Sequence, residues 1–125
     1  MRILLDTHAL IWLMEANPRL NDNASVLITD ADEVCVSSAS IWEVAIKARL
    51  GKIKTDPREL FELAQRAGLK ELQVSARHAI VTRSLPLVHP DPFDRLLVAQ
   101  AISEPMHLLT ADAKLAEYSE LVIVI

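Results

Sequence analysis

Several features that are common in proteins are scarce in this sequence, and each scarcity excludes a class of protein. The single cysteine, Cys35, excludes an internal disulfide framework. The two glycines, Gly51 and Gly68, cannot build a glycine-rich phosphate loop of the P-loop or dinucleotide-binding type. No apolar run reaches the roughly 18 residues of a membrane-spanning helix. A disulfide-stabilised scaffold and a membrane-spanning protein are therefore both excluded at this stage.

Positive charge is also scarce. The 125 residues include 13 basic and 17 acidic side chains, a net charge of −4. This balance argues against a protein that binds nucleic acid through net positive charge, but it leaves open an enzyme that reaches phosphates through a bound metal. Only three apolar residues separate Arg2 from Asp6, too few for the core of a signal peptide. We therefore expect a cytoplasmic protein.

Length and composition favour a single globular domain over residues 1–125. Hydrophobic residues make up 51% of the chain and charged residues 24%, which is an ordinary globular balance. A chain of this length buries about two-thirds of the surface that it exposes when unfolded, so it has a substantial core. The proline-rich segment 86–92 is interpreted as a loop inside this domain.

Short apolar strands alternate with helices along the chain. Strands are expected at 3–5, 34–36, 72–74, 107–109 and 121–125, and helices at 7–14, 20–31, 40–50, 56–67, 76–84 and 92–102. Wholly apolar strands that alternate with helices are typical of a parallel sheet covered on both faces. We therefore predict an α/β fold, a three-layer α/β/α domain with a mainly parallel sheet of about five strands.

Acidic residues follow the predicted strands at several separate places. Asp6 follows the first strand, Glu43 comes shortly after the second, and Asp112 follows the fourth. Asp91 and Asp94 stand at the amino end of the helix that leads into the fourth strand, and so at the same edge of the sheet. Because ligands of open parallel sheets bind at the carboxyl ends of the strands, we expect these carboxylates to converge on one rim.

Each of these acids also has a purely structural interpretation as a helix cap. Ser40 and Glu43 fit a capping box, Asp91 fits a cap followed by proline, and Asp6 and Asp112 fit simple caps. Converging carboxylates, however, repel one another and lose hydration, which a hard divalent cation relieves. Oxygen ligands suit Mg²⁺ or Mn²⁺, and such a metal supports hydrolysis at phosphate.

At these residues the sequence resembles the PIN-domain family of metal-dependent ribonucleases, and especially the VapC-type toxins of bacterial type II toxin–antitoxin pairs. Four segments carry the resemblance in the family's order: LDTHALIW at 5–12, SSASIWEVAIK at 37–47, HPDPFDRLLVAQA at 89–101 and LTAD at 109–112. The resemblance covers nearly the whole chain. It implies a PIN-like endoribonuclease directed at single-stranded RNA, dependent on Mg²⁺ or Mn²⁺ and usually a homodimer. It also implies a small VapB-like antitoxin that blocks the site and connects the protein to operator DNA.

The family's acidic residues correspond to Asp6, Glu43, Asp94 and Asp112, so the resemblance implies that these four form the catalytic and metal-binding set. Asp6 and Asp94 are expected to hold the metal, while Glu43 and Asp112 complete the pocket and position the attacking water or a second metal. Weaker candidates around them are Thr7, Ser38, Thr110, Asp91 and Arg95. The three hydroxyls either orient carboxylates or cap helices. The arginine either contacts an RNA phosphate or pairs with the neighbouring Asp91.

Other residues near the rim have less specific interpretations. Lys47 stands four residues after the glutamate, which suits a helical ion pair that could orient that carboxylate. His8 and His89 lie near the rim, but an all-oxygen metal site does not need an imidazole. Trp12 and Trp42 are expected to pack in the core or at a subunit interface rather than to stack on bases.

Two other classes of function are compared with the nuclease. A catalytically silent PIN-like binding or regulatory module is expected to have lost one of the four acids, and this chain has them all. A phosphate-accepting receiver domain needs an acidic pair after the first strand, an acceptor aspartate after the central strand and a lysine after a later one. Here Asp6 stands alone, Ser37 and Ser38 follow the second strand, and no lysine lies between Leu109 and Asp112. The nuclease is therefore the favoured prediction.

Overall fold

Five short strands form a wholly parallel sheet in the computed structural model, which describes residues 1–125. They are β1 (Arg2–Leu5), β2 (Glu33–Ser37), β3 (Lys70–Leu72), β4 (His107–Thr110) and β5 (Val122–Val124), in the spatial order β3-β2-β1-β4-β5. The chain first builds outward from β1 through β2 to β3, and later returns to place β4 on the other side of β1. The strand order therefore reverses at the β1/β4 junction, where open parallel sheets bind their ligands.

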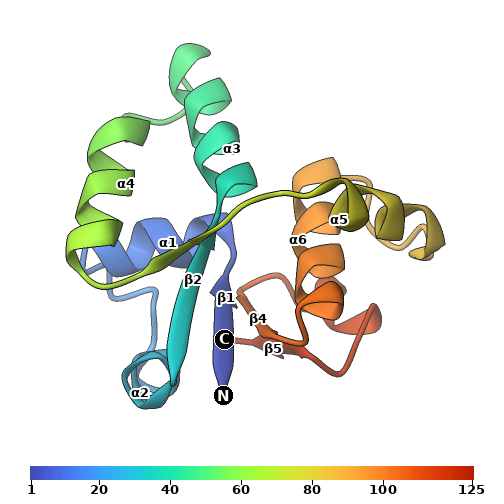
Figure 1. Ribbon diagram of the computed structural model, residues 1–125. Coiled ribbons are helices and arrows are strands. Elements are labelled where there is room, and N and C mark those ends of the chain that lie inside the picture. The colour runs from blue at the N-terminus through green and yellow to red at the C-terminus, as the bar shows by residue number, and fades with distance from the viewer.

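Helices cover both faces of this sheet. They are α1 (Thr7–Met14), α2 (Asp22–Asp30), α3 (Ser38–Arg49), α4 (Pro57–Arg66), α5 (Ala76–Val81) and α6 (Pro92–Ser103), with the 3-10 turns η1 (Thr82–Ser84) and η2 (Ala113–Glu117). Figure 1 shows α1, α2 and α4 on one side of the strands and α5 and α6 on the other, with α3 rising from the end of β2. The predicted three-layer α/β/α architecture is confirmed. None of the helices has the length and apolar character needed to cross a membrane.

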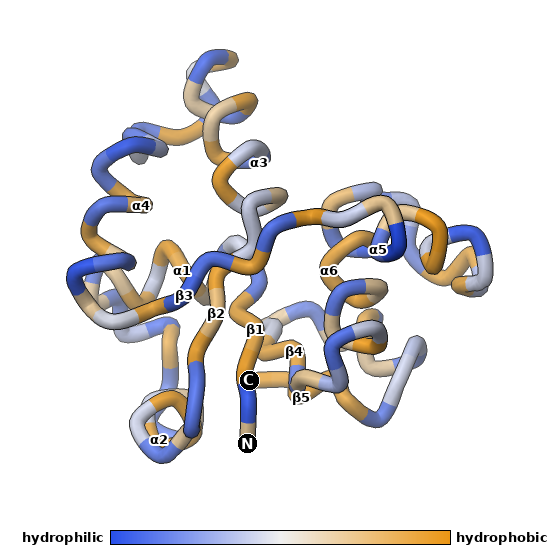
Figure 2. Tube along the Cα trace, viewed as in Figure 1, coloured by the Kyte–Doolittle hydropathy of each residue, from blue (hydrophilic) through white to orange (hydrophobic).

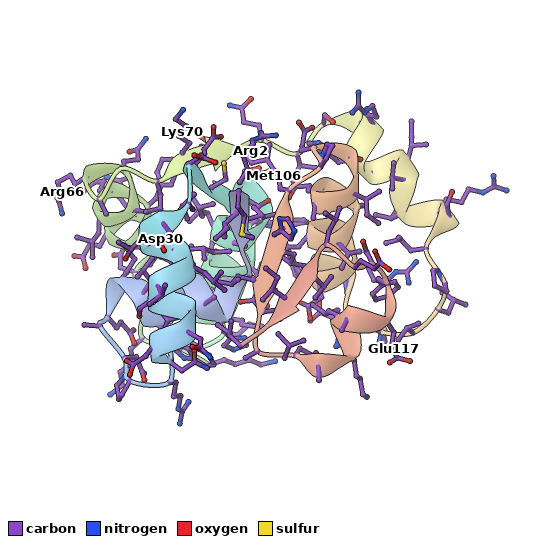
Figure 3. All side chains as sticks on the ribbon, turned by 90° about the horizontal axis from the view of Figure 1, so that it is seen from below. Arg2, Asp30, Arg66, Lys70, Met106 and Glu117 are labelled. Carbon is purple, nitrogen blue, oxygen red and sulfur yellow. The ribbon has the colours of Figure 1, made fainter.

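The core consists of two apolar clusters, one on each face of the sheet. Alternate residues of β1 point to opposite faces: Ile3 and Leu5 join the cluster under α1 and α4, and Leu4 joins the cluster under α6. Each buried side chain of this size contributes about 1.5–3 kcal/mol, which explains why the central strands are apolar between their first residues and their carboxyl ends. Figure 2 shows this hydrophobic centre, and Figure 3 shows Met106 inside it and Glu117 at the periphery.

Several predicted boundaries are wrong, and three of the elements begin two residues away from the predicted position. Helix α3 begins at Ser38 because the hydroxyl of Ser37 accepts the Ala39 N–H and caps the helix, so Ser40 lies inside it and forms no capping box with the glutamate. Strand β3 spans 70–72 rather than 72–74, because α4 ends in a turn at Gly68, with a φ of 89°, that leads directly into the strand. Helix α2 begins at Asp22 because the side chain of Asn21 caps it.

Candidate active site

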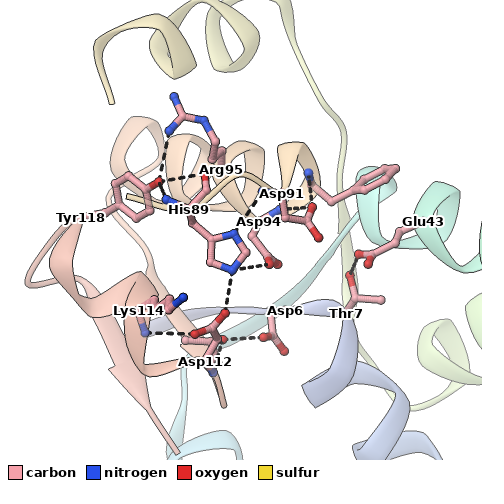
Figure 4. Close-up of polar contacts among 12 residues, drawn as sticks. Asp6, Thr7, Glu43, His89, Asp91, Asp94, Arg95, Asp112, Lys114 and Tyr118 are labelled. Carbon is pink, nitrogen blue, oxygen red and sulfur yellow. Dashed lines mark hydrogen bonds and ion pairs between the residues drawn. The ribbon is translucent and has the colours of Figure 1, made fainter. Parts of the chain in front are cut away.

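The four predicted acidic residues lie on one rim of the sheet, at the β1/β4 junction (Figure 4). Asp6 directly follows β1 and Asp112 follows β4, while Glu43 and Asp94 lie near the amino ends of α3 and α6. Helices α1, α3 and α6 and the 3-10 turn η2 all begin at this rim, and the positive amino ends of their dipoles favour negative charge there. The sheet topology thus brings together side chains that are far apart in sequence.

Asp6 is the most deeply held of the four carboxylates. It is 4% exposed, and its Oδ1 accepts the Ala9 N–H at 2.8 Å, capping α1. The Thr110 hydroxyl donates to Oδ2 at 2.6 Å, across the β1/β4 junction. Burial raises the pKa of Asp6, and these two hydrogen bonds oppose the rise. Thr110 therefore orients a carboxylate, as one of its two predicted roles required.

Glu43 is also buried, but both of its oxygens have partners. The Thr7 hydroxyl lies 2.6 Å from Oε1 and the Lys47 ammonium 2.7 Å from Oε2. The hydrogen bond to Glu43 raises the pKa of Lys47, so the ammonium stays charged. Ser40 lies 3.0 Å from the Thr7 oxygen and completes this buried group. The predicted ion pair is present, and it orients Glu43 from one helical turn away.

Asp94 is the least compensated acid of the rim. Its side chain is only 21% exposed, and the nearest basic atom is the His89 Nε2 at 3.7 Å, beyond hydrogen-bond distance. No donor of the chain forms a hydrogen bond to its carboxylate, whose nearby acids are Asp91, Glu43 and Asp6. Burial first, and then these negative neighbours, raise the pKa of Asp94 to about 7. Such a carboxylate lacks a positively charged partner.

Asp112 is held by a histidine to which the sequence assigned no specific role. Its Oδ1 accepts the Lys114 N–H and caps η2, while its Oδ2 lies 2.9 Å from the His89 Nε2. The His89 Nδ1 accepts the Asp91 N–H at 3.1 Å, so the ring proton is assigned to Nε2, which donates to Asp112. Tyr118 fixes the histidine further by accepting its backbone N–H. The sequence feature that could have indicated this role is the position of His89 just before the Asp-Pro-Phe-Asp segment.

The protonation of the His89 ring indicates which residues of the acidic cluster are candidates for metal ligands. His89, Asp94 and Asp112 each offer one potential ligand atom, and these atoms lie within 4.8 Å of one another. A histidine that ligates through Nε2 has no proton there and donates from Nδ1, whereas here Nδ1 accepts a backbone N–H. The carboxylates are therefore the metal-ligand candidates, and His89 orients them.

The remaining predicted residues lie at the rim without reaching the carboxylates. The Ser38 hydroxyl accepts the Val74 N–H and ties α3 to the chain after β3. Asp91 caps α6 through the N–H groups of its first turn. Arg95 does not pair with Asp91: its guanidinium donates to the carbonyls of Thr82, Leu85 and Pro86 and to the Tyr118 hydroxyl. These hydrogen bonds turn it away from the carboxylates.

The two tryptophans are less buried than a core position requires. Trp42 is 61% exposed and forms an edge-to-face contact with Phe93, at a ring-centroid distance of 5.3 Å. Trp12 is half-buried, with its ring 5.9 Å from that of His8. Trp42 therefore does not lie in the core, and of its two predicted locations only the subunit interface remains as a prediction.

Comparison with known proteins places this geometry in a family. The family model described as the PIN domain matches residues 3–121. The chain is also 33% identical over 118 residues to Ribonuclease VapC22 of Mycobacterium tuberculosis, and the match covers 93% of this chain and 91% of that one. The chain belongs to the PIN domain family.

Solved structures agree with this assignment at the level of the fold. VapBC2 from Rickettsia felis, bound to a DNA fragment from its promoter, matches this PIN domain with a TM-score of 0.73 and 18% identity, over 100% of this chain and 98% of that one. DNA-bound VapBC from Salmonella typhimurium matches with a TM-score of 0.70 and 17% identity, over 100% and 97%. Both neighbours therefore share the architecture of this chain.

Proposed function

We propose that this PIN domain is a metal-dependent endoribonuclease that acts as the toxin of a type II toxin–antitoxin pair. The observation that carries the proposal is Asp94, a mostly buried carboxylate with no hydrogen-bond donor, set beside three further acids. The name of the relative, a ribonuclease, supports RNA as the substrate. The presence of all four acidic residues argues against a catalytically silent module.

The donor set fits Mg²⁺ or Mn²⁺. Carboxylate oxygens are the ligands of hard divalent cations, and the uncompensated charge of Asp94 is the charge that such a cation neutralises. Asp94, Asp6 and Asp112 are proposed to hold the metal, directly or through water. When bound, the metal lowers the pKa of water and stabilises charge on the phosphoryl oxygens.

Glu43 is proposed to act on the attacking water. Thr7 and Lys47 hold its two oxygens in place, so the carboxylate is oriented before substrate arrives. A positioned carboxylate next to the phosphate accepts the proton that the nucleophilic water loses during hydrolysis. His89 keeps Asp112 in position on the opposite side of Asp94. In this arrangement the attack is in line with the phosphodiester bond that breaks.

An antitoxin-type partner is proposed to control this site. A hollow of about 560 Å³ opens between α1, α3 and α4, with an apolar lining that includes Ile11, Met14 and Leu63. Thr7 and Lys47 connect it to the acidic rim, because both also contact the glutamate. A small protein that lies in the hollow is well placed to extend an arginine or lysine into the carboxylates. Loss of inhibition after that residue is removed tests this arrangement.

Homodimerisation and a cytoplasmic location are further parts of the proposal. Trp42 and Ile46 on α3 and Leu50 at its C-cap recur every four residues and are 61%, 36% and 62% exposed, so they form an exposed apolar stripe. A second copy of the chain that covers this stripe accounts for its composition. Leu50→Glu is expected to shift the molecular mass measured by light scattering from dimer to monomer, whereas Arg66→Glu on the exposed face of α4 leaves the dimer intact.

The deciding experiment is cleavage of total cellular RNA by the purified protein freed from its partner. We expect discrete fragments with Mg²⁺ or Mn²⁺ and none with EDTA, Asp94→Asn or Glu43→Gln. Asp30→Asn, an exposed aspartate at the end of α2, is the matched control and cleaves like the wild type. Cleavage that survives EDTA and both site variants contradicts the proposal, and silence of a folded, metal-binding protein on native host RNA favours a binding module.

A further inference from the structure

A second pocket adjoins the carboxylates on the side of α1. Its volume is about 340 Å³, within the range of about 300–1,000 Å³ usual for small-ligand sites. The lining residues are of two kinds, three carboxylates on one side and an aromatic pair with a cation on the other: Asp6, Asp94, Asp112, His8, Trp12 and Arg19. The pocket therefore continues the acidic site toward groups that the hydrolysis itself does not need.

Arg19 is an uncommitted cation. It is exposed, its backbone N–H donates to Asn17, and its guanidinium forms no ion pair or hydrogen bond with the rest of the chain. Arg95 differs, because four hydrogen bonds to the chain occupy its guanidinium. A free guanidinium binds phosphate through two parallel hydrogen bonds. In a protein of net charge −4, such a group offsets the repulsion between the acids and a polyanion.

His8 and Trp12 supply an aromatic surface in the same pocket. They stand one helical turn apart on α1, with ring centroids 5.9 Å apart and ring planes inclined by 41°. Trp12 is half-buried, which limits the movement of its ring. Unpaired bases of single-stranded nucleic acid stack favourably on such side chains. A base held in a duplex cannot do so.

We propose that this pocket binds the nucleotide next to the scissile phosphodiester of a single-stranded RNA. Its base stacks on Trp12 and His8, and its phosphate meets Arg19, while the scissile phosphate lies at the carboxylates. The pocket thus selects unpaired RNA and fixes the strand relative to the acids. This inference rests on the proposed nuclease function for the identity of the ligand, but the pocket is testable by binding alone.

The test uses Trp12 as its own reporter. Trp12 and Trp42 are the only tryptophans, so Trp42→Phe leaves Trp12 as the sole source of tryptophan emission. Glu43→Gln is added to keep the RNA intact, and circular dichroism checks that the protein is folded. Titration with a short unstructured RNA in Mg²⁺ is expected to quench the emission. The same sequence as a duplex leaves it unchanged.

Substitutions of the arginine separate phosphate binding from general charge. Arg19→Ala is expected to weaken the binding of fluorescently labelled single-stranded RNA about tenfold, with Arg19→Lys intermediate because it keeps the charge without the paired donors. Arg66→Ala, an exposed arginine outside the pocket, is the matched control and leaves the affinity unchanged. RNA binding without a change in Trp12 emission, or equal effects of Arg19→Ala and Arg66→Ala, overturns the proposal.

A parallel cleavage assay distinguishes this inference from the proposed function. Quenching and Arg19 dependence without cleavage by the wild-type protein support the pocket as an RNA-binding site and contradict the nuclease. Metal-dependent cleavage with no quenching contradicts the pocket and leaves the nuclease standing. In a cleaving protein, Arg19→Ala is expected to raise KM more than it lowers kcat, because the arginine lies in the flanking pocket rather than at the carboxylates.

Discussion

Removal of the Asp94 charge is expected to stabilise the metal-free protein. Burial and three neighbouring acids raise the pKa of Asp94 to about 7 from an ordinary value of 3.8. The folded state therefore binds the proton more tightly than the unfolded state, and stability falls as the pH rises from about 4 to about 7. Asp94→Asn keeps the shape of the side chain and removes the charge, so it recovers the lost stability.

The structure also sets the size of this effect. The difference between about 7 and 3.8, at about 1.36 kcal/mol per pH unit, gives an upper bound of about 4 kcal/mol above pH 7. The side chain is 21% exposed, and the neighbouring acids contribute to the repulsion. We therefore expect Asp94→Asn to raise the free energy of unfolding by about 2 kcal/mol. Below about pH 4 the aspartate is protonated in both states, and the gain disappears.

The assay is urea unfolding in EDTA at about pH 8 and about pH 4, with Asp94→Asn and Asp30→Asn compared with the wild type. Only Asp94→Asn is expected to raise the free energy of unfolding, and only at the higher pH. Saturating Mg²⁺ is expected to stabilise the wild type and to erase or reverse the advantage of Asp94→Asn, since the metal relieves the same repulsion. An Asp94→Asn protein that is no more stable than the wild type at about pH 8 refutes the reasoning.

Three further predictions concern single residues at or near the rim. Thr110→Val removes the 2.6 Å hydrogen bond to Asp6 and is expected to cost about 1.5–3 kcal/mol in urea unfolding, while Thr110→Ser retains most of the stability. His89→Ala removes the hydrogen-bond donor of Asp112 and is expected to weaken Mn²⁺ binding about tenfold or more, as measured by calorimetry. His89→Asn is expected to lose less affinity. Unchanged affinity in His89→Ala contradicts the orienting role. Arg95→Met is expected to lower the free energy of unfolding by about 2–4 kcal/mol without changing Mn²⁺ affinity, because the partners of Arg95 are backbone carbonyls and Tyr118. A loss of metal binding without a loss of stability contradicts this prediction.

The sequence predicted the architecture because its local signals agree with one another. Apolar strands such as 3–5 and 34–36 have no charged residue to face water, so they require helices on both faces. Asp56–Pro57 and Asp91–Pro92 begin helices where they were expected to. Where several hydroxyls compete for one cap, as at Ser37, Ser38 and Ser40, the register of the neighbouring strand decides, and the predicted boundary was wrong.

The candidate site was predicted in outline for a similar reason. In a parallel sheet every strand ends at the same edge, so an acid after each strand predicts a shared rim without knowledge of the contacts. The roles of individual residues within the rim were harder to predict from the sequence. Thr7 and Thr110 orient carboxylates and Ser38 does not, although all three are hydroxyls at the ends of strands. The direction in which each points depends on the segment packed against it.

The sequence by itself therefore determined the layers of this PIN domain and the edge at which its acids gather, because periodicity and strand-end chemistry are local. Only the tertiary structure decided which groups meet there. Thr110 reaches Asp6 across 104 positions of the chain because β4 pairs with β1. His89 separates Asp94 from Asp112, and Arg19 faces the same pocket as Trp12. These are encounters between distant segments, which no local pattern of residues specifies.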